Sequence, residues 1–130
     1  MKAYTLCFIQ RGKQILLLNR KFAPNLGLWN GVGGKIEPGE ILIESALREI
    51  KEETGITDIS IKMVAYVTLV NGKKPYLIIA YLCETLTESV TLSNEHQAFI
   101  WADEETCKEL LPEEIITDFE RNKIFECLEV

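Results

Sequence analysis

The spacing of apolar residues predicts strand-like segments in the first four fifths of the chain. Five apolar-rich runs, at residues 4–9, 14–19, 59–70, 75–83 and 97–101, are typical of β-strands. Residues 11–13 separate the first two runs and residues 71–74 separate the next two, and both connections contain glycine. Each of these pairs therefore predicts a β-hairpin.

Helical spacing appears in the remaining segments. Residues 40–54 contain neither Gly nor Pro, and small or apolar side chains recur there every three or four positions, at Ile43, Ala46, Leu47, Ile50 and Thr54. Pro38 and Gly39 mark the start of this helix and Gly55 marks its end. Residues 103–110, which begin with an Asp cap candidate, and residues 113–128 predict two further helices.

Length and composition indicate one domain that spans residues 1–130. The chain has 130 residues, of which 47% are hydrophobic, and this is enough for one buried core but too short for two ordinary domains. Strands that alternate with helices favour a mixed sheet covered by helices on both faces. We therefore expect a single α/β domain.

Three glutamates stand together on the predicted central helix. Glu49, Glu52 and Glu53 are spaced i, i+3 and i+4, so their carboxylates share one surface face. Like charges at these spacings cost an isolated helix roughly 0.2–0.5 kcal/mol per pair, which favours a compensating cation. Oxygen ligands suit Mg²⁺ or Mn²⁺. The alternative is a solvated acidic helix face without a ligand.

A glycine cluster precedes that helix. Gly31, Gly33 and Gly34 allow the backbone to approach a phosphate or a metal ion, and they are also compatible with a simple tight loop. The cluster is not a P-loop, because Ile36 follows Lys35 where Ser or Thr is required. Ile36 also occupies the third glycine position of a dinucleotide-binding fingerprint, so both common nucleotide folds are disfavoured.

The charge of the chain limits its partners. A net charge of −6 argues against binding to polymeric DNA or RNA, which needs clustered cations, but not against a small phosphate ester bridged by a metal ion. The apolar run near the start is too short for a signal-peptide core, and no segment reaches the length of a membrane helix. We expect a soluble, cytoplasmic protein that does not associate with membranes.

The cysteines and the histidine do not indicate a zinc or thiol site. The four cysteines are widely separated without a C-x-x-C pair, and His96 is the only histidine in the sequence. We expect reduced, non-catalytic cysteines. No local context supports a nucleophilic Cys–His pair, so His96 is expected at a strand edge or lining a pocket.

One continuous motif joins the glycines to the glutamates. From Gly34 to Ile56 the sequence matches G-x5-E-x7-R-E-U-x-E-E-x-G-U, where U is aliphatic, at every fixed position. This pattern resembles the signature of the Nudix hydrolases, which cleave nucleoside diphosphates linked to another moiety. The resemblance implies the α/β/α Nudix sandwich with a mixed central sheet.

The resemblance also implies roles for the motif residues. Glu49, Glu52 and Glu53 would hold Mg²⁺, with the Gly34 carbonyl as a further ligand. Arg48 would orient a glutamate of the helix, and Glu40 would support that network. In such a mechanism the metal ion activates water and a carboxylate accepts its proton.

The general base is left open among three glutamates. Glu52 and Glu53 on the helix are candidates, as is Glu95, which occupies a position where relatives often place an additional metal ligand or base. The alternative for Glu95 is an ordinary surface acid.

Substrate selection is implied outside the motif. The run around Asn30, Gly33 and Lys35 resembles the branch that hydrolyses oxidised purine nucleoside triphosphates, where Asn reaches the base and Lys anchors phosphate. Glu113 and Glu114 resemble a pair of acids that hold the oxidised purine in that branch, although Leu111 replaces a stacking Trp. A helix start with favourable acids would explain the same residues.

Three functional hypotheses follow. The first is a Mg²⁺-dependent nucleoside triphosphate pyrophosphohydrolase, with 8-oxo-dGTP as a candidate substrate. The second is a Nudix hydrolase of another diphosphate, such as a nucleotide sugar, ADP-ribose or a dinucleotide. The third, a ligand sensor without catalysis, is disfavoured because the motif is complete. The oligomeric state is left open.

Overall fold

The computed structural model describes residues 1–128 of the chain. Over these residues it contains seven strands and four helices, and none of the helices is long and apolar enough to cross a membrane. The elements are β1 (Lys2–Arg11), β2 (Gln14–Arg20), β3 (Trp29–Asn30), β4 (Val32–Lys35), α1 (Leu42–Thr54), β5 (Ser60–Val70), β6 (Tyr76–Glu84), β7 (His96–Ala102), α2 (Glu104–Leu110), α3 (Glu113–Arg121) and α4 (Ile124–Cys127).

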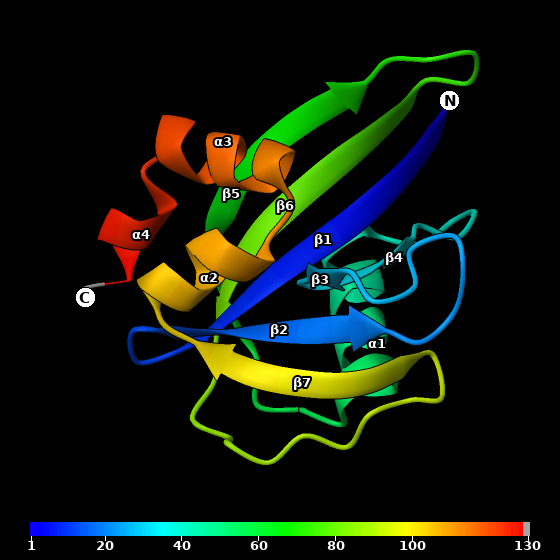
Figure 1. The fold of residues 1–130 in the computed structure, drawn as a ribbon. Helices are drawn as coiled ribbons and strands as arrows, with labels where there is room; N and C mark the ends of the chain where they lie inside the picture. The colour runs from blue at the N-terminus through cyan, green and yellow to red at the C-terminus, as the bar shows by residue number, and fades with distance from the viewer. Residues whose placement is uncertain (129–130) are drawn as a thin grey trace.

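Strand β1 organises the sheet. It pairs in parallel with β6 along most of its length, and antiparallel with β4 and, at the hairpin end, with β2. Strand β2 diverges from β1 to pair with β7 and β3, while β5 forms the outer edge beyond β6 (Figure 1). Both predicted hairpins, β1–β2 and β5–β6, are confirmed.

The mixed sheet separates two hydrophobic cores, as the predicted α/β architecture requires. Helix α1 covers one face, where Ala46 and Ile50 pack on strand residues such as Cys7 and Ile9. Helices α2 to α4 cover the opposite face, where Phe119 is fully buried against Phe8 (Figure 1). The central strands are therefore buried on both faces of the sheet. This burial explains why these strands are continuous apolar runs in the sequence.

The prediction of which residues of α1 are buried was wrong in part. Ala46, Ile50 and Thr54 are buried as expected, but Ile43 and Leu47 are 47% and 37% exposed. Glu49 and Glu53, expected on a surface face, are instead 9% and 6% exposed. The helix is turned so that its acidic side faces β4 and the segment before β7, and the burial of that side depends on polar partners rather than on apolar contacts.

The last predicted helix is divided. Lys123 adopts a left-handed conformation with φ 54° between α3 and α4, so the chain changes direction within the range predicted as one helix. This turn lets Phe125 pack edge-to-face on Phe119 at 5.2 Å, while Phe119 also contacts Phe8 at 4.6 Å. Aromatic packing therefore favours the break over a continuous helix.

Candidate active site

The close packing of helix α1 against β4 depends on a glycine. Gly34 lies beside Glu49, and any Cβ at position 34 would overlap the Glu49 carboxylate. Glu49 is thereby held against the backbone of a strand while its side chain remains 12% exposed. The glycine provides a space that only a residue without a side chain leaves open.

Arg48 forms ion pairs with three carboxylates beside this contact between α1 and β4. Its guanidinium donates to both oxygens of Glu40, with Nε–Oε2 and Nη2–Oε1 distances of 2.7 and 2.9 Å. Nη1 also donates to Glu49 at 3.0 Å and to Glu52 at 3.2 Å, and Nη2 reaches the Lys35 carbonyl at 3.3 Å. The bidentate pair with Arg48, together with the Glu37 N–H, lowers the pKa of Glu40 to about 2.

Glu53 is held by a different set of partners at the end of α1. The segment before β7 docks on this end through backbone hydrogen bonds from Thr91 to Thr54 and from Ser93 to Glu53. The Ser93 hydroxyl donates to Glu53 Oε2 at 2.7 Å, and His96 Nδ1 lies 2.9 Å from the same oxygen. The His96 contact is a close approach rather than a well-aligned hydrogen bond.

Neighbouring carboxylates of α1 have opposite pKa shifts. Burial raises the pKa of Glu53, but the interactions with His96 and Ser93 outweigh it, so the net pKa lies below the ordinary value. Burial also raises the pKa of Glu49, and the charges of Glu52 and Glu53 add to this against the opposing effect of Arg48. The pair with Arg48 therefore does not fully offset the burial of Glu49 beside two like charges.

A cleft opens beside these carboxylates. It has a volume of about 420 Å³ and reaches from the start of α3, across β1 and β6, to the beginning of β7. Asn30 and Gly33 line it on the side of β3 and β4, Glu114 lines it on the side of α3, and His96 closes the end that contacts Glu53. A polar group at each end and apolar residues between them are typical of a small-molecule site.

A model of the NUDIX domain matches residues 2–120, which include all of the elements that build this site. The chain belongs to the Nudix family.

Named relatives fall into two groups. Mouse asymmetrical bis(5'-nucleosyl)-tetraphosphatase is 37% identical over 62% of this chain and 59% of its own length. Mouse oxidized purine nucleoside triphosphate hydrolase is 33% identical over 52% of this chain and 43% of its own length. The chain thus spans less than two thirds of either relative.

Solved Nudix structures share the fold over nearly the whole chain. A C. elegans Ap4A hydrolase in a binary complex superimposes with a TM-score of 0.80 at 26% identity, covering 98% of each chain. A MutT protein from Methanosarcina mazei Go1 has a TM-score of 0.78 at 30% identity, covering 94% of this chain and 92% of its own.

The structure brings some of the predicted Nudix site residues together and separates others. Asn30, Gly33 and Glu114 share the cleft, whereas Lys35 and Glu113 do not line it. Leu111 is buried in the core below α3 and only 4% exposed. It therefore does not occupy the position of a residue that stacks on a base. The Pro112 carbonyl accepts from the first turn of α3, as expected for a helix start.

Glu95 lies beside the end of the Nudix helix. Its backbone N–H donates to Ser93 Oγ at 3.3 Å, and its side chain also interacts with Glu53 and helps to lower the pKa of Glu53. The Glu95 carboxylate pairs with Arg20 at 3.4 Å, and its side chain is 50% exposed.

The Nudix carboxylates fit a divalent cation in chemistry but are not gathered around one point. Over residues 1–128, no three His, Cys, Asp or Glu side chains form a group that could hold a metal ion as they stand. Arg48 draws Glu49 and Glu52 to one side, while His96 and Ser93 hold Glu53 on the other. The oxygen donors, the opening at Gly34 and the burial of Glu49 beside two other carboxylates nevertheless suit a hard cation.

Three residues of this region were not predicted as site residues. Arg20 lines the cleft and pairs with Glu95, Ser93 donates to Glu53, and His96 was expected only as a strand-edge or pocket-lining residue. Nothing local in the sequence marks Arg20 or Ser93. His96, as the only histidine, was the one available signal.

Arg48 is expected to stabilise the fold independently of any ligand. Arg48→Gln leaves three crowded carboxylates without a shared donor, so the free energy of unfolding should fall by about 1–3 kcal/mol. Arg11→Gln, which removes an exposed 3.6 Å pair with Glu88, should cost about 0–1 kcal/mol. Urea unfolding of both variants measures this difference. Equal losses would mean that the Arg48 network contributes no more than a surface ion pair.

Proposed function

We propose that this protein is a divalent-metal-dependent Nudix hydrolase that cleaves a phosphoric anhydride bond of a small nucleotide. The leading reaction converts a nucleoside triphosphate and water to a monophosphate and pyrophosphate, with 8-oxo-dGTP as a candidate substrate in the cytoplasmic nucleotide pool. One observation carries the proposal: the cleft lined by Asn30 and Glu114 is also lined by His96, which contacts Glu53 of the Nudix helix. A base and a phosphate chain can therefore be held at the same time.

The Nudix helix supplies the proposed metal ligands. Glu49, Glu52 and Glu53 would hold Mg²⁺, with the Gly34 carbonyl beside them, and Mn²⁺ would substitute. When bound, the ion neutralises phosphate oxygens and lowers the pKa of water. Nudix hydrolases generally use divalent ions. Binding requires Glu49 and Glu52 to exchange contacts with Arg48 for contacts with the ion.

The chain's own residues then position the reactants. Arg48 holds Glu40 beside the helix through a hydrogen bond. The pKa of Glu53 lies below its ordinary value, so that carboxylate stays ionised. Water attacks phosphorus, the bond to the bridging oxygen breaks, and a carboxylate takes the proton. Among the three candidate bases, Glu52 is 54% exposed at the site, while the Glu95 carboxylate is already paired with Arg20.

A second candidate substrate is a dinucleoside polyphosphate. The mouse relative with 37% identity is named as an asymmetrical bis(5'-nucleosyl)-tetraphosphatase, and the C. elegans structure with a TM-score of 0.80 is an Ap4A hydrolase. The cleft also extends along β6, where Tyr76 and Ile78 line it. This extension favours a substrate longer than a triphosphate.

Hydrolysis is expected to depend on a divalent cation. Released pyrophosphate and phosphate should be measured for canonical and oxidised nucleoside triphosphates, diadenosine tetraphosphate, ADP-ribose and a nucleotide sugar. Excess chelator should abolish all activity, and Mg²⁺ or Mn²⁺ should restore it, because the buried acids need a cation to approach phosphate. Full activity in chelator would refute the metal-dependent mechanism.

Replacement of Glu53 by Gln should lower turnover by at least about a hundredfold. The amide keeps the shape needed for Ser93 but loses the charge, so thermal unfolding should show that the fold survives. Glu44→Gln, in the exposed first turn of the same helix, is the matched control and should change turnover less than about twofold. If turnover of Glu53→Gln fell less than about threefold, about 0.6 kcal/mol, Glu53 would not be an essential ligand.

The cleft residues are expected to discriminate among bases. Asn30→Ala should lower kcat/KM for 8-oxo-dGTP by about tenfold more than for a pyrimidine triphosphate, because an unpaired base edge costs roughly 1–3 kcal/mol. Glu114→Gln should change the ratio of oxidised to normal purine. Glu113→Gln is the control, because Glu113 does not line the cleft whereas the adjacent Glu114 does. Uniform losses on all nucleotides would show that Asn30 serves the phosphates or the fold.

A further inference from the structure

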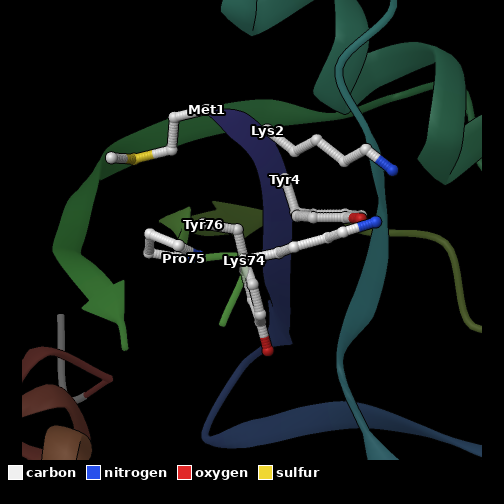
Figure 2. Close-up of a pocket in the computed structure, with 6 residues that line it drawn as sticks. All are labelled: Met1, Lys2, Tyr4, Lys74, Pro75 and Tyr76. Carbon is white, nitrogen blue, oxygen red and sulfur yellow. The ribbon is translucent and has the colours of Figure 1, made fainter. Parts of the chain in front are cut away.

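A second pocket lies where the start of β1 meets the β5–β6 turn. Its volume is about 610 Å³, and its lining residues are Met1, Lys2, Tyr4, Lys74, Pro75 and Tyr76. Figure 2 shows the side chains of Lys2, Tyr4 and Lys74 extending to the same side, with the Tyr4 ring between the two lysines, while Tyr76 points in another direction. None of the residues proposed for catalysis contributes to it.

The lining combines flat apolar surface with unpaired positive charge. The rings of Tyr4 and Tyr76 meet edge-to-face at 5.3 Å, so their faces point in different directions and offer stacking surface. The salt bridges found within residues 1–128 involve neither Lys2 nor Lys74. In a protein with a net charge of −6, two such lysines beside aromatic rings form a local attraction for an aromatic anion.

The pocket is continuous with the cleft of the candidate active site. Tyr76 lines both, on β6, where it pairs with Lys2 of β1. Tyr4 pairs across β1–β4 with Lys35, whose carbonyl accepts from Arg48. Side chains at paired positions lie on the same face of a sheet, so the pocket and the cleft are adjacent regions of one surface.

We infer that this pocket binds the distal nucleotide of a dinucleoside polyphosphate whose first nucleoside lies in the cleft. The base would stack on Tyr4 or Tyr76, and the adjacent phosphate would accept hydrogen bonds from Lys2 and Lys74. A nucleoside triphosphate has one base and would leave this pocket empty. The inference rests on the proposed hydrolase function and selects, within it, the dinucleoside polyphosphate class.

The kinetic test compares two doubly substituted proteins with equal loss of charge. Lys2→Ala with Lys74→Ala removes the pocket cations, whereas Lys13→Ala with Lys73→Ala removes exposed lysines that do not line the pocket. For diadenosine tetraphosphate, kcat/KM of the first protein should fall about tenfold through KM, a change expected when two charged hydrogen bonds are lost. For ATP, it should change less than about twofold. The control should resemble the wild type on both substrates.

Equal losses on ATP and diadenosine tetraphosphate, or no loss on either, would overturn the inference. A binding measurement separates its failure from that of the proposed function. In excess chelator, where hydrolysis is stopped, the Kd of diadenosine tetraphosphate should be about tenfold weaker for the pocket double variant than for the control. If the wild-type protein hydrolysed no nucleotide, the proposed function would be refuted. The Kd difference would still test the proposed pocket. Equal Kd values would refute the pocket.

Discussion

The contact between Arg48 and the carboxylates around it is the interaction on which the site depends. Three acids within reach of one another would repel, and two of the glutamates of α1 are largely buried, where an uncompensated charge is costly. The guanidinium offers a planar set of donors that satisfies Glu40 in a bidentate manner and still reaches Glu49 and Glu52. Lysine, with one compact ammonium group, could not reproduce this geometry.

The backbone of β4 makes this arrangement possible. Gly34 leaves the space for Glu49, and the Lys35 carbonyl gives Arg48 an additional acceptor, so a short strand at the side of β1 positions helix α1. Toward the end of the helix, Ser93 in the segment before β7 and His96 at the start of β7 contact Glu53. The acids of one helix are thus divided between two supports that are far apart in sequence.

Much of the fold was predictable because its signals are local. The two hairpins follow from apolar runs separated by glycine-containing turns, and Asp103 caps α2 by accepting from the Thr106 N–H. Strands β3 and β4 were not predicted, because glycine-rich segments become strands only by pairing with β2 and β1. The burial of Glu49 and Glu53 was missed for the same reason: their partners lie on other elements. In the site, the motif identified Arg48 and the acids, while Arg20 and Ser93 are recognisable only by proximity.

The same division explains why the chain resembles relatives with different substrates. In the proposed reaction the acids of α1 would face phosphate groups, which all nucleotides share, so they would not distinguish one base from another or detect a second nucleoside. Selectivity must come from the sheet surface beyond it, where Leu111 is buried in the core and leaves no aromatic ring at that position. Aromatic surface is available instead at Tyr4 and Tyr76, at the other end of the cleft. This distribution of aromatic side chains is the physical basis of the proposed distal-nucleotide pocket, because a base that lies beyond the phosphates would find stacking surface at Tyr4 and Tyr76.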